Sequence, residues 1–162
     1  MRRAVAVTGA ASTLVLLTAG VAIAESQTVQ GSGDIDQMTA VNARSAVNVK
    51  VQGMAPPCDT HFLHVTVNWR GPAKYVAEAG CFGAAWEKGL FYLDSDDDQN
   101  PTEVNCSDFV FRWNGTGDFF KVEFPRDCLA EAPNRIRVGA EGHVYSSTTG
   151  SEAGPTRLLS RG

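Results

Sequence analysis

The sequence is short of three features that would point to a specific activity: clustered basic residues, nucleophile or metal motifs, and long helical or apolar stretches. Lysine and arginine together number 14 against 18 aspartates and glutamates, so the chain has a formal net charge of -4. An acidic chain repels the phosphate backbone, which argues against nucleic acid as a partner. Neutral sugars, peptides and cations remain compatible with this charge.

The motifs of the common hydrolases are missing. The chain has no G-x-S-x-G, no S-x-x-K and no H-E-x-x-H, the patterns that carry a nucleophile or zinc ligands in their families. Asp108, Asp118 and Glu123 are available as paired carboxylates for glycoside hydrolysis, which spacing alone does not exclude. We therefore predict that the protein is not an enzyme and place a small hydrolase last among the function classes.

One apolar stretch stands out, at the start of the chain. Arg2 and Arg3 precede uncharged, largely apolar residues that end at the small-x-small site Ala22-Ile23-Ala24. This layout is typical of a secretory signal peptide. A membrane anchor is the alternative, but Gly and Thr dilute the stretch, and no later stretch is long enough to span a bilayer. We predict a secreted, extracellular protein that loses residues 1–24, and the general secretory route rather than twin-arginine export.

All four cysteines lie after this leader. In an exported chain an even number of cysteines predicts two disulfides. Sequence alone allows three pairings, and we favour Cys58–Cys81 and Cys106–Cys128 because each closes a loop of roughly twenty residues. Zinc binding is the alternative, but the chain lacks the C-x-x-C spacing of common zinc sites.

Alternation of apolar and polar residues dominates the rest of the chain and predicts strands that are buried on one face. The clearest runs are 47–52, 63–70, 109–114, 120–124 and 135–139, and weaker strands are expected near 36–42, 73–78 and 89–94. Asn114-Gly115-Thr116-Gly117 is the best hairpin signal. No helical period reaches ten residues, although 127–132 is compatible with a short helical turn. We predict an all-β, antiparallel β-sandwich, jelly-roll or immunoglobulin-like.

The composition divides the chain into four parts. We expect a signal peptide at 1–24, a flexible leader at 25–34, the β-sandwich domain at 35–146 and a flexible tail at 147–162. The leader and the tail are rich in small polar residues, which are typical of loose chain ends. One domain of this size is expected to be a monomer.

The acidic loop after residue 93 carries the strongest candidate for a cofactor. Asp94, Asp96 and Asp98 have the alternating spacing that calcium loops use, and Asn100 and Glu103 add oxygen donors. The loop departs from an EF-hand because it lacks the glycine at position six and the glutamate at position twelve. The alternative is a solvated acidic turn, and the sequence leaves both open.

Aromatic residues are the candidates for ligand binding. Trp86 has loop-like neighbours and, with Tyr75, is predicted to stack on a ligand. For both residues burial in the core is the alternative. Trp69 and Trp113 are in phase with the apolar faces of their strands and are expected in the core.

The histidines carry less weight. His61 and His64 are three residues apart on a predicted strand, which sends them to opposite faces and argues against a shared metal. His143 stands alone and is expected to be a surface or hydrogen-bonded residue.

Several short motifs resemble those of a known family. They are an Asp-x-Asp turn after a strand at 90–96, an Asp-aromatic strand at 106–111 and a Pro-x-x-x-Leu corner at 125–129. Their order resembles the secreted DOMON-like β-sandwiches that include family 9 carbohydrate-binding modules, and small exported proteins of unknown function from high-GC Gram-positive bacteria. The resemblance implies a jelly-roll-like sandwich, often with a structural calcium ion, and binding rather than catalysis. The sugar-clamping aromatics of that family have no residue-by-residue match here.

These observations predict a secreted, non-catalytic binding module whose partner is a saccharide or a cell-surface polymer. The alternative is an exported protease inhibitor or protein-interaction domain. In that case residues 53–60, around Pro56-Pro57-Cys58, would be the exposed loop that a disulfide braces.

Overall fold

The computed structural model describes residues 24–71, 73–82, 85–94, 100–146 and 149–162. The predicted signal peptide lies outside them except for Ala24. The strands are β1 Glu25–Ser32, β2 Gln37–Asn42, β3 Ala46–Gln52, β4 Thr60–Val67, β5 Ala73–Phe82, β6 Ala85–Asp94, β7 Thr102–Glu103, β8 Val110–Asn114, β9 Phe119–Pro125, β10 Arg135–Ile136, β11 Val138–Val144, β12 Ser151–Ala153 and β13 Leu159–Ser160. The described residues contain no α-helix, and the predicted helical turn is a 3-10 helix, η1, at Arg126–Cys128.

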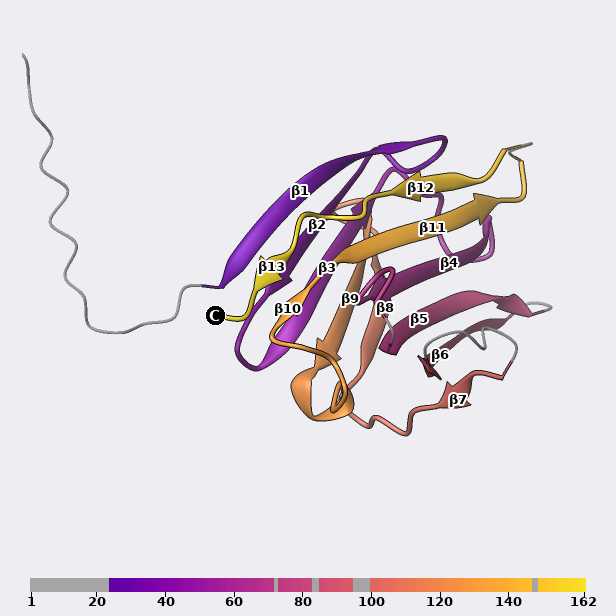
Figure 1. Cartoon of the computed structure of the whole chain (residues 1–162). Coiled ribbons are helices and arrows are strands. Elements are labelled where there is room, and N and C mark those ends of the chain that lie inside the picture. Colours follow the sequence, from indigo (N-terminus) through magenta and orange to yellow (C-terminus); the bar gives the residue numbers. More distant parts are fainter. Residues whose placement is uncertain (1–23, 72, 83–84, 95–99, 147–148) are drawn as a thin grey trace, which may run out of the picture.

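Eleven of the described strands form one antiparallel sheet in the order β7-β6-β5-β4-β11-β12-β1-β2-β3-β9-β8. The sheet curls so that its two halves face each other (Figure 1). β1 joins the halves, because its first six residues pair with β2 and its last two pair with β12. β10 and β13 form a separate small pair. The predicted all-β, antiparallel sandwich with two disulfides is therefore confirmed.

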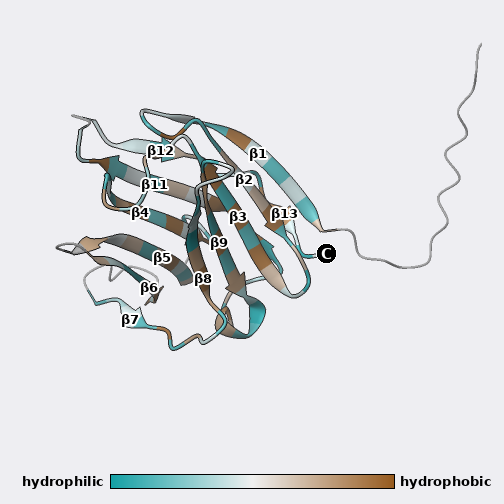
Figure 2. Ribbon diagram, turned by 180° about the vertical axis from the view of Figure 1, so that it is seen from behind, coloured by the Kyte–Doolittle hydropathy of each residue, from teal (hydrophilic) through white to brown (hydrophobic). Residues whose placement is uncertain are grey.

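The alternation that predicted the strands also builds the core. Along β9, every second residue is buried, and β3 and β4 follow the same rule over most of their length. Figure 2 shows the alternation as stripes of hydrophobic and hydrophilic residues. One buried cluster takes Leu63 and Val65 from one half of the sheet and Val49 and Phe120 from the other. Burying both inner faces against each other gives the curled sheet its stability.

Both favoured cysteine pairings are confirmed. Cys58 is bonded to Cys81 and Cys106 to Cys128. The first bridge ties the loop before β4 to the end of β5, and the second ties the segment before β8 to η1. Each bond closes a loop of about twenty residues, which limits the freedom of the unfolded chain.

Two segments expected to be flexible are instead part of the fold. The predicted leader contains β1, which lies inside the sheet, and the predicted tail contains β12 and β13. Small polar residues suffice in β1 because backbone groups make the ladder. In the tail, Thr156 exchanges two hydrogen bonds with Val138, through its backbone N–H and its hydroxyl. The composition predicted that both segments are mobile, whereas pairing with other strands orders β1, β12 and β13.

Candidate functional site

The outer face of β11, β4, β5 and β6 is hollowed. The hollow, called here the sheet hollow, has a volume of about 560 Å³. Its lining residues are His64, Thr66, Trp69, Arg70, Lys74, Val76, Glu78, Phe91, Leu93, Pro101 and Glu141. It therefore combines an apolar floor with acidic and basic groups, the mixture typical of small-ligand sites.

Cross-strand pairing places these side chains side by side. In one row, His64 of β4 lies opposite Glu141 of β11 and Glu78 of β5. In the next row, Thr66 lies opposite Gly139 and Val76. Since the alternate residues of β4 point into the core, His64 and Thr66 must point outward.

Trp69 corrects the sequence prediction, because it lies on the outer face and not in the core. Gly139 shares a face with Thr66, and a Cβ atom placed on Gly139 would overlap the Trp69 ring. The physical reason is Asn68, whose φ of 63° breaks the alternation of β4. The strand would otherwise have carried Trp69 inward with Val67.

The turn that presents Trp69 is held by its own hydrogen bonds. The Asn68 side-chain amide donates to the Ala73 carbonyl at 2.6 Å, and the Gly71 N–H donates to the Asn68 carbonyl at 2.8 Å. Arg70 also has a left-handed φ of 64°. Non-glycine residues in this region cost about 1–3 kcal/mol each and concentrate at functional sites. The strained turn and its outward tryptophan therefore mark this end of the hollow as a candidate site.

Charge is separated along the sheet hollow. His64 Nε2 lies 3.6 Å from Glu78 Oε1, with the side chains 32% and 40% exposed. Because both groups are this exposed, the pair contributes little stability. Lys74 lies four residues from Glu78 on β5, which at the rise of a strand is about 13 Å. Acidic groups thus stand at one end of the hollow, with Lys74 and Arg70 at the other.

Neither of the aromatics predicted to bind ligand lies in the sheet hollow. Tyr75 is 3% exposed, and its hydroxyl accepts a hydrogen bond from the Glu131 N–H at 3.0 Å. Trp86 is half-buried and packs against the core, with its ring stacked on Phe120 at 5.5 Å. Both point inward because Trp86 pairs with Cys81, which shares the buried phase of β5 with Tyr75.

The predicted calcium loop lies partly outside the described residues, since these leave out Asp96 and Asp98. Asp94 ends β6, and both Asn100 and Glu103 are exposed beyond it. Burial and, next, the Asp94 carboxylate raise the pKa of Tyr92. Among the described residues, no group of three or more histidine, cysteine, aspartate or glutamate side chains is arranged to hold a metal. Calcium binding stays a prediction.

Two of the histidines, His61 and His143, lie close together on neighbouring strands. The register between β4 and β11 shifts between His143 and Val144, and the irregularity brings the His61 ring to 6.0 Å from the His143 ring. Phe62 lies between them and His64, with its ring 4.9 Å from the His64 ring. A local bulge of this kind is not visible in the sequence pattern.

The structure separates one of the acids considered for glycoside hydrolysis from the other two. Asp108 precedes β8 and Asp118 follows it, so the length of the strand separates them. Glu123 pairs with Val110, two residues after Asp108, and forms an ion pair with Lys121 at 2.8 Å. The three acids are therefore not assembled into one site.

Comparison with known proteins adds no family to this description. No protein-family model, no curated protein and no solved structure matches the chain. Within the described residues, no helix is long and apolar enough to cross a membrane. The resemblance to DOMON-like sandwiches thus stays a prediction, and the function is argued from the site alone.

Proposed function

We propose that the protein is an exported, non-catalytic binding module that holds a saccharide, or a polymer of saccharides, in the sheet hollow. The observation that carries the proposal is the outward Trp69 ring, which lies against Gly139 and lines the hollow beside polar side chains. Sugar rings have an apolar face that stacks on aromatic rings and a rim of hydroxyls that hydrogen-bond to polar groups. The hollow offers both kinds of contact.

The polar groups of the hollow support this ligand class over a purely apolar one. Glu78 and Glu141 accept hydrogen bonds, Lys74 and Arg70 donate them, and Thr66 does both. The acidic and basic side chains balance, so the hollow has no strong preference for a charged ligand. Val76, Phe91 and Leu93 supply the apolar floor.

The decisive experiment is a polysaccharide pull-down and glycan array, followed by calorimetry on whichever oligosaccharide binds. Trp69→Ala should abolish retention, since stacking is lost. Tyr145→Ala is the matched control, because Tyr145 is 57% exposed and lies outside the lining of the hollow. Glu141→Gln, an exposed change that leaves the fold intact, should weaken binding without abolishing it. Failure of the folded wild-type protein to bind any saccharide would refute the proposal.

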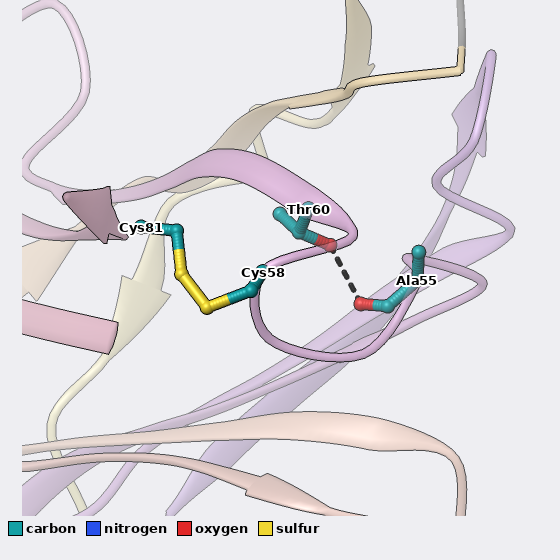
Figure 3. Close-up of a disulfide and its surroundings, with 4 residues drawn as sticks. All are labelled: Ala55, Cys58, Thr60 and Cys81. Carbon is teal, nitrogen blue, oxygen red and sulfur yellow. Dashed lines mark hydrogen bonds between the residues drawn. A yellow bond between two sulfur atoms is a disulfide. The ribbon is translucent and has the colours of Figure 1, made fainter. Parts of the chain in front are cut away.

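A second candidate is a protein-interaction or protease-inhibiting loop at residues 53–60. The loop is braced by the Cys58–Cys81 bond and by the Thr60 hydroxyl, which donates to the Ala55 carbonyl at 2.6 Å (Figure 3). The N–H groups of Asp59 and Thr60 both donate to the Pro56 carbonyl, so the loop is a tight turn. Incubation with trypsin-like and subtilisin-like proteases tests it, and retained protease activity would argue against inhibition.

We also propose that the protein is exported and that it binds calcium. Disulfide bonds are typical of exported proteins, and cleavage after Ala24 would leave Glu25, the first residue of β1, at the new N-terminus. Mass spectrometry of the secreted protein tests this cleavage site.

For calcium, a dissociation constant on the order of 0.1–1 mM is expected outside the cell. Millimolar calcium should therefore raise the melting temperature relative to chelator at matched ionic strength. Equal midpoints would leave a solvated acidic turn.

A further inference from the structure

A second hollow lies where β10 and β13 meet the turn between β2 and β3. It has a volume of about 500 Å³ and is lined by Arg44, Asn134, Arg135, Ser160, Arg161 and Gly162. We call it the arginine hollow. It shares no lining residue with the sheet hollow, so an inference about it does not depend on the proposed saccharide site.

Hydrogen bonds hold the Arg161 guanidinium in place. Arg161 donates its backbone N–H to the Asn134 carbonyl at 2.8 Å, and its guanidinium donates twice to the Arg44 carbonyl, at 3.2 and 2.8 Å. Arg135 pairs with Ser160 across the small sheet. The turn and the small sheet are therefore joined through Arg161, and residues of both line the hollow.

Arg126 adds a fourth guanidinium behind this group. Its backbone N–H donates to the Ser45 carbonyl, and its Nη2 is buried without a hydrogen-bond partner. Burial and, next, the charge of Arg161 lower the pKa of Arg126 to about 10. A buried donor without a partner is costly. Arg126 does not line the hollow, so it adds positive charge near the hollow and not a contact within it.

The cluster has an acidic neighbour in Glu25 but forms no ion pair with the described residues. None of the four guanidinium groups lies within 4.0 Å of a carboxylate of the described residues. One carboxylate nearby is that of Glu25, which accepts a hydrogen bond from the Ser160 N–H at 2.5 Å. That bond and, with smaller effect, the charges of Arg157 and Arg135 lower the pKa of Glu25. Four cations thus surround this end of an otherwise acidic chain.

We propose that the arginine hollow binds a tetrahedral oxyanion, either inorganic phosphate or sulfate or the same group as an ester on a larger molecule. Guanidinium groups present planar pairs of donors that match two oxygens of such an anion. The Asn134 amide, which also lines the hollow, supplies a further donor. The shape and the donor set favour an oxyanion over chloride, which has no directional acceptors to match a fork of donors.

The test is a titration of the purified protein with phosphate, sulfate and glycerol phosphate, followed by NMR and calorimetry, with chloride at equal ionic strength as the reference. Saturable shifts of the Ser160 and Arg161 amide signals are expected with the oxyanions. Tighter binding of glycerol phosphate than of phosphate would identify an ester as the preferred form, and the reverse order would identify the free ion. Arg44→Gln and Arg135→Gln should each weaken binding about tenfold or more, whereas Arg112→Gln, an exposed change on β8, should not.

Two results would overturn the proposal. One is an effect of phosphate and sulfate no larger than that of chloride, which would mean general charge screening. The other is binding that Arg112→Gln weakens as much as Arg44→Gln does. If a variant at the hollow fails to fold, the amide shifts of the wild-type protein still decide, because shifts confined to residues away from β13 would place the anion elsewhere.

Discussion

The two outer faces of the curled sheet are built by the same alternation, yet the sheet hollow lies on the first face. The second face is formed by the outward side chains of β2, β3, β9 and β8, and of these Pro125, at the end of β9, lines a smaller hollow. One of its rows runs Thr39, Lys50, Lys121, Arg112. Its groups are satisfied locally: Gln37 donates to Gln52 at 2.7 Å, and Lys50 lies 4.3 Å from the centre of the Phe119 ring.

The difference comes from one turn. On the first face, Asn68 breaks the period of β4 and turns a tryptophan outward over a glycine. On the second face, no described residue of β3 or β9 has a positive φ, so Phe120 and Phe124 stay inside. On the first face, an interruption of the pattern that made the sheet thus places an aromatic ring on the outside.

The largest effects should come from the core that both faces share. Phe120→Ala, beneath the second face, and Leu63→Ala, beneath the first, are each expected to lower the free energy of unfolding by about 3–5 kcal/mol, because both side chains are fully buried. Urea denaturation measures this. A loss below 1 kcal/mol at one site but not at the other would show that the two halves do not share one core.

Asn68→Ala should have the next largest effect on the free energy of unfolding. The change removes the hydrogen bond to Ala73. It also leaves alanine, which has no polar side chain to bond locally, in the left-handed region. The free energy of unfolding should fall by about 2–3 kcal/mol. Asn48→Ala, at a half-buried position of the second face, is the control and should change the free energy by less than about 0.5 kcal/mol. Equal losses would mean that the turn carries no special role.

Gly139→Val should separate ligand binding from stability. A side chain here displaces the Trp69 ring, so saccharide binding at the sheet hollow should be lost. Overpacking of this kind costs about 1–3 kcal/mol, which leaves the fold largely populated. Calorimetry measures the binding and thermal melts the stability. Unchanged binding would show that the position of the Trp69 ring does not matter.

The smallest effect is expected on the second face. Lys121→Ala removes the ion pair with Glu123, but both side chains are about one third exposed, and Lys50 and Arg112 flank Lys121 with like charge. The free energy of unfolding should change by less than about 0.5 kcal/mol, and less still at high salt. A loss above 1 kcal/mol in urea titrations would show that the second face is more constrained than its contacts indicate.

The amino-acid sequence by itself determined the all-β class and the main strands, because each depends on local period. It left three cysteine pairings open, and short loop closure only favoured the pairing that the structure has. The polar period of β1 was not recognised as a strand, since its order comes from two neighbours distant in the sequence. The same holds for β12 and β13 at the other end of the chain.

The tertiary structure alone decided the candidate sites. His64, Glu78 and Glu141 are far apart in the chain and meet because β4 pairs with both β5 and β11. Trp69 looked like a core residue, since nothing in the alternation reveals that Asn68 adopts a left-handed φ. The arginine hollow likewise depends on β13 returning to β10. The alternation within one strand can be seen in the sequence. Which strands lie side by side, and therefore which side chains share a face, depends on long-range pairing in the folded chain.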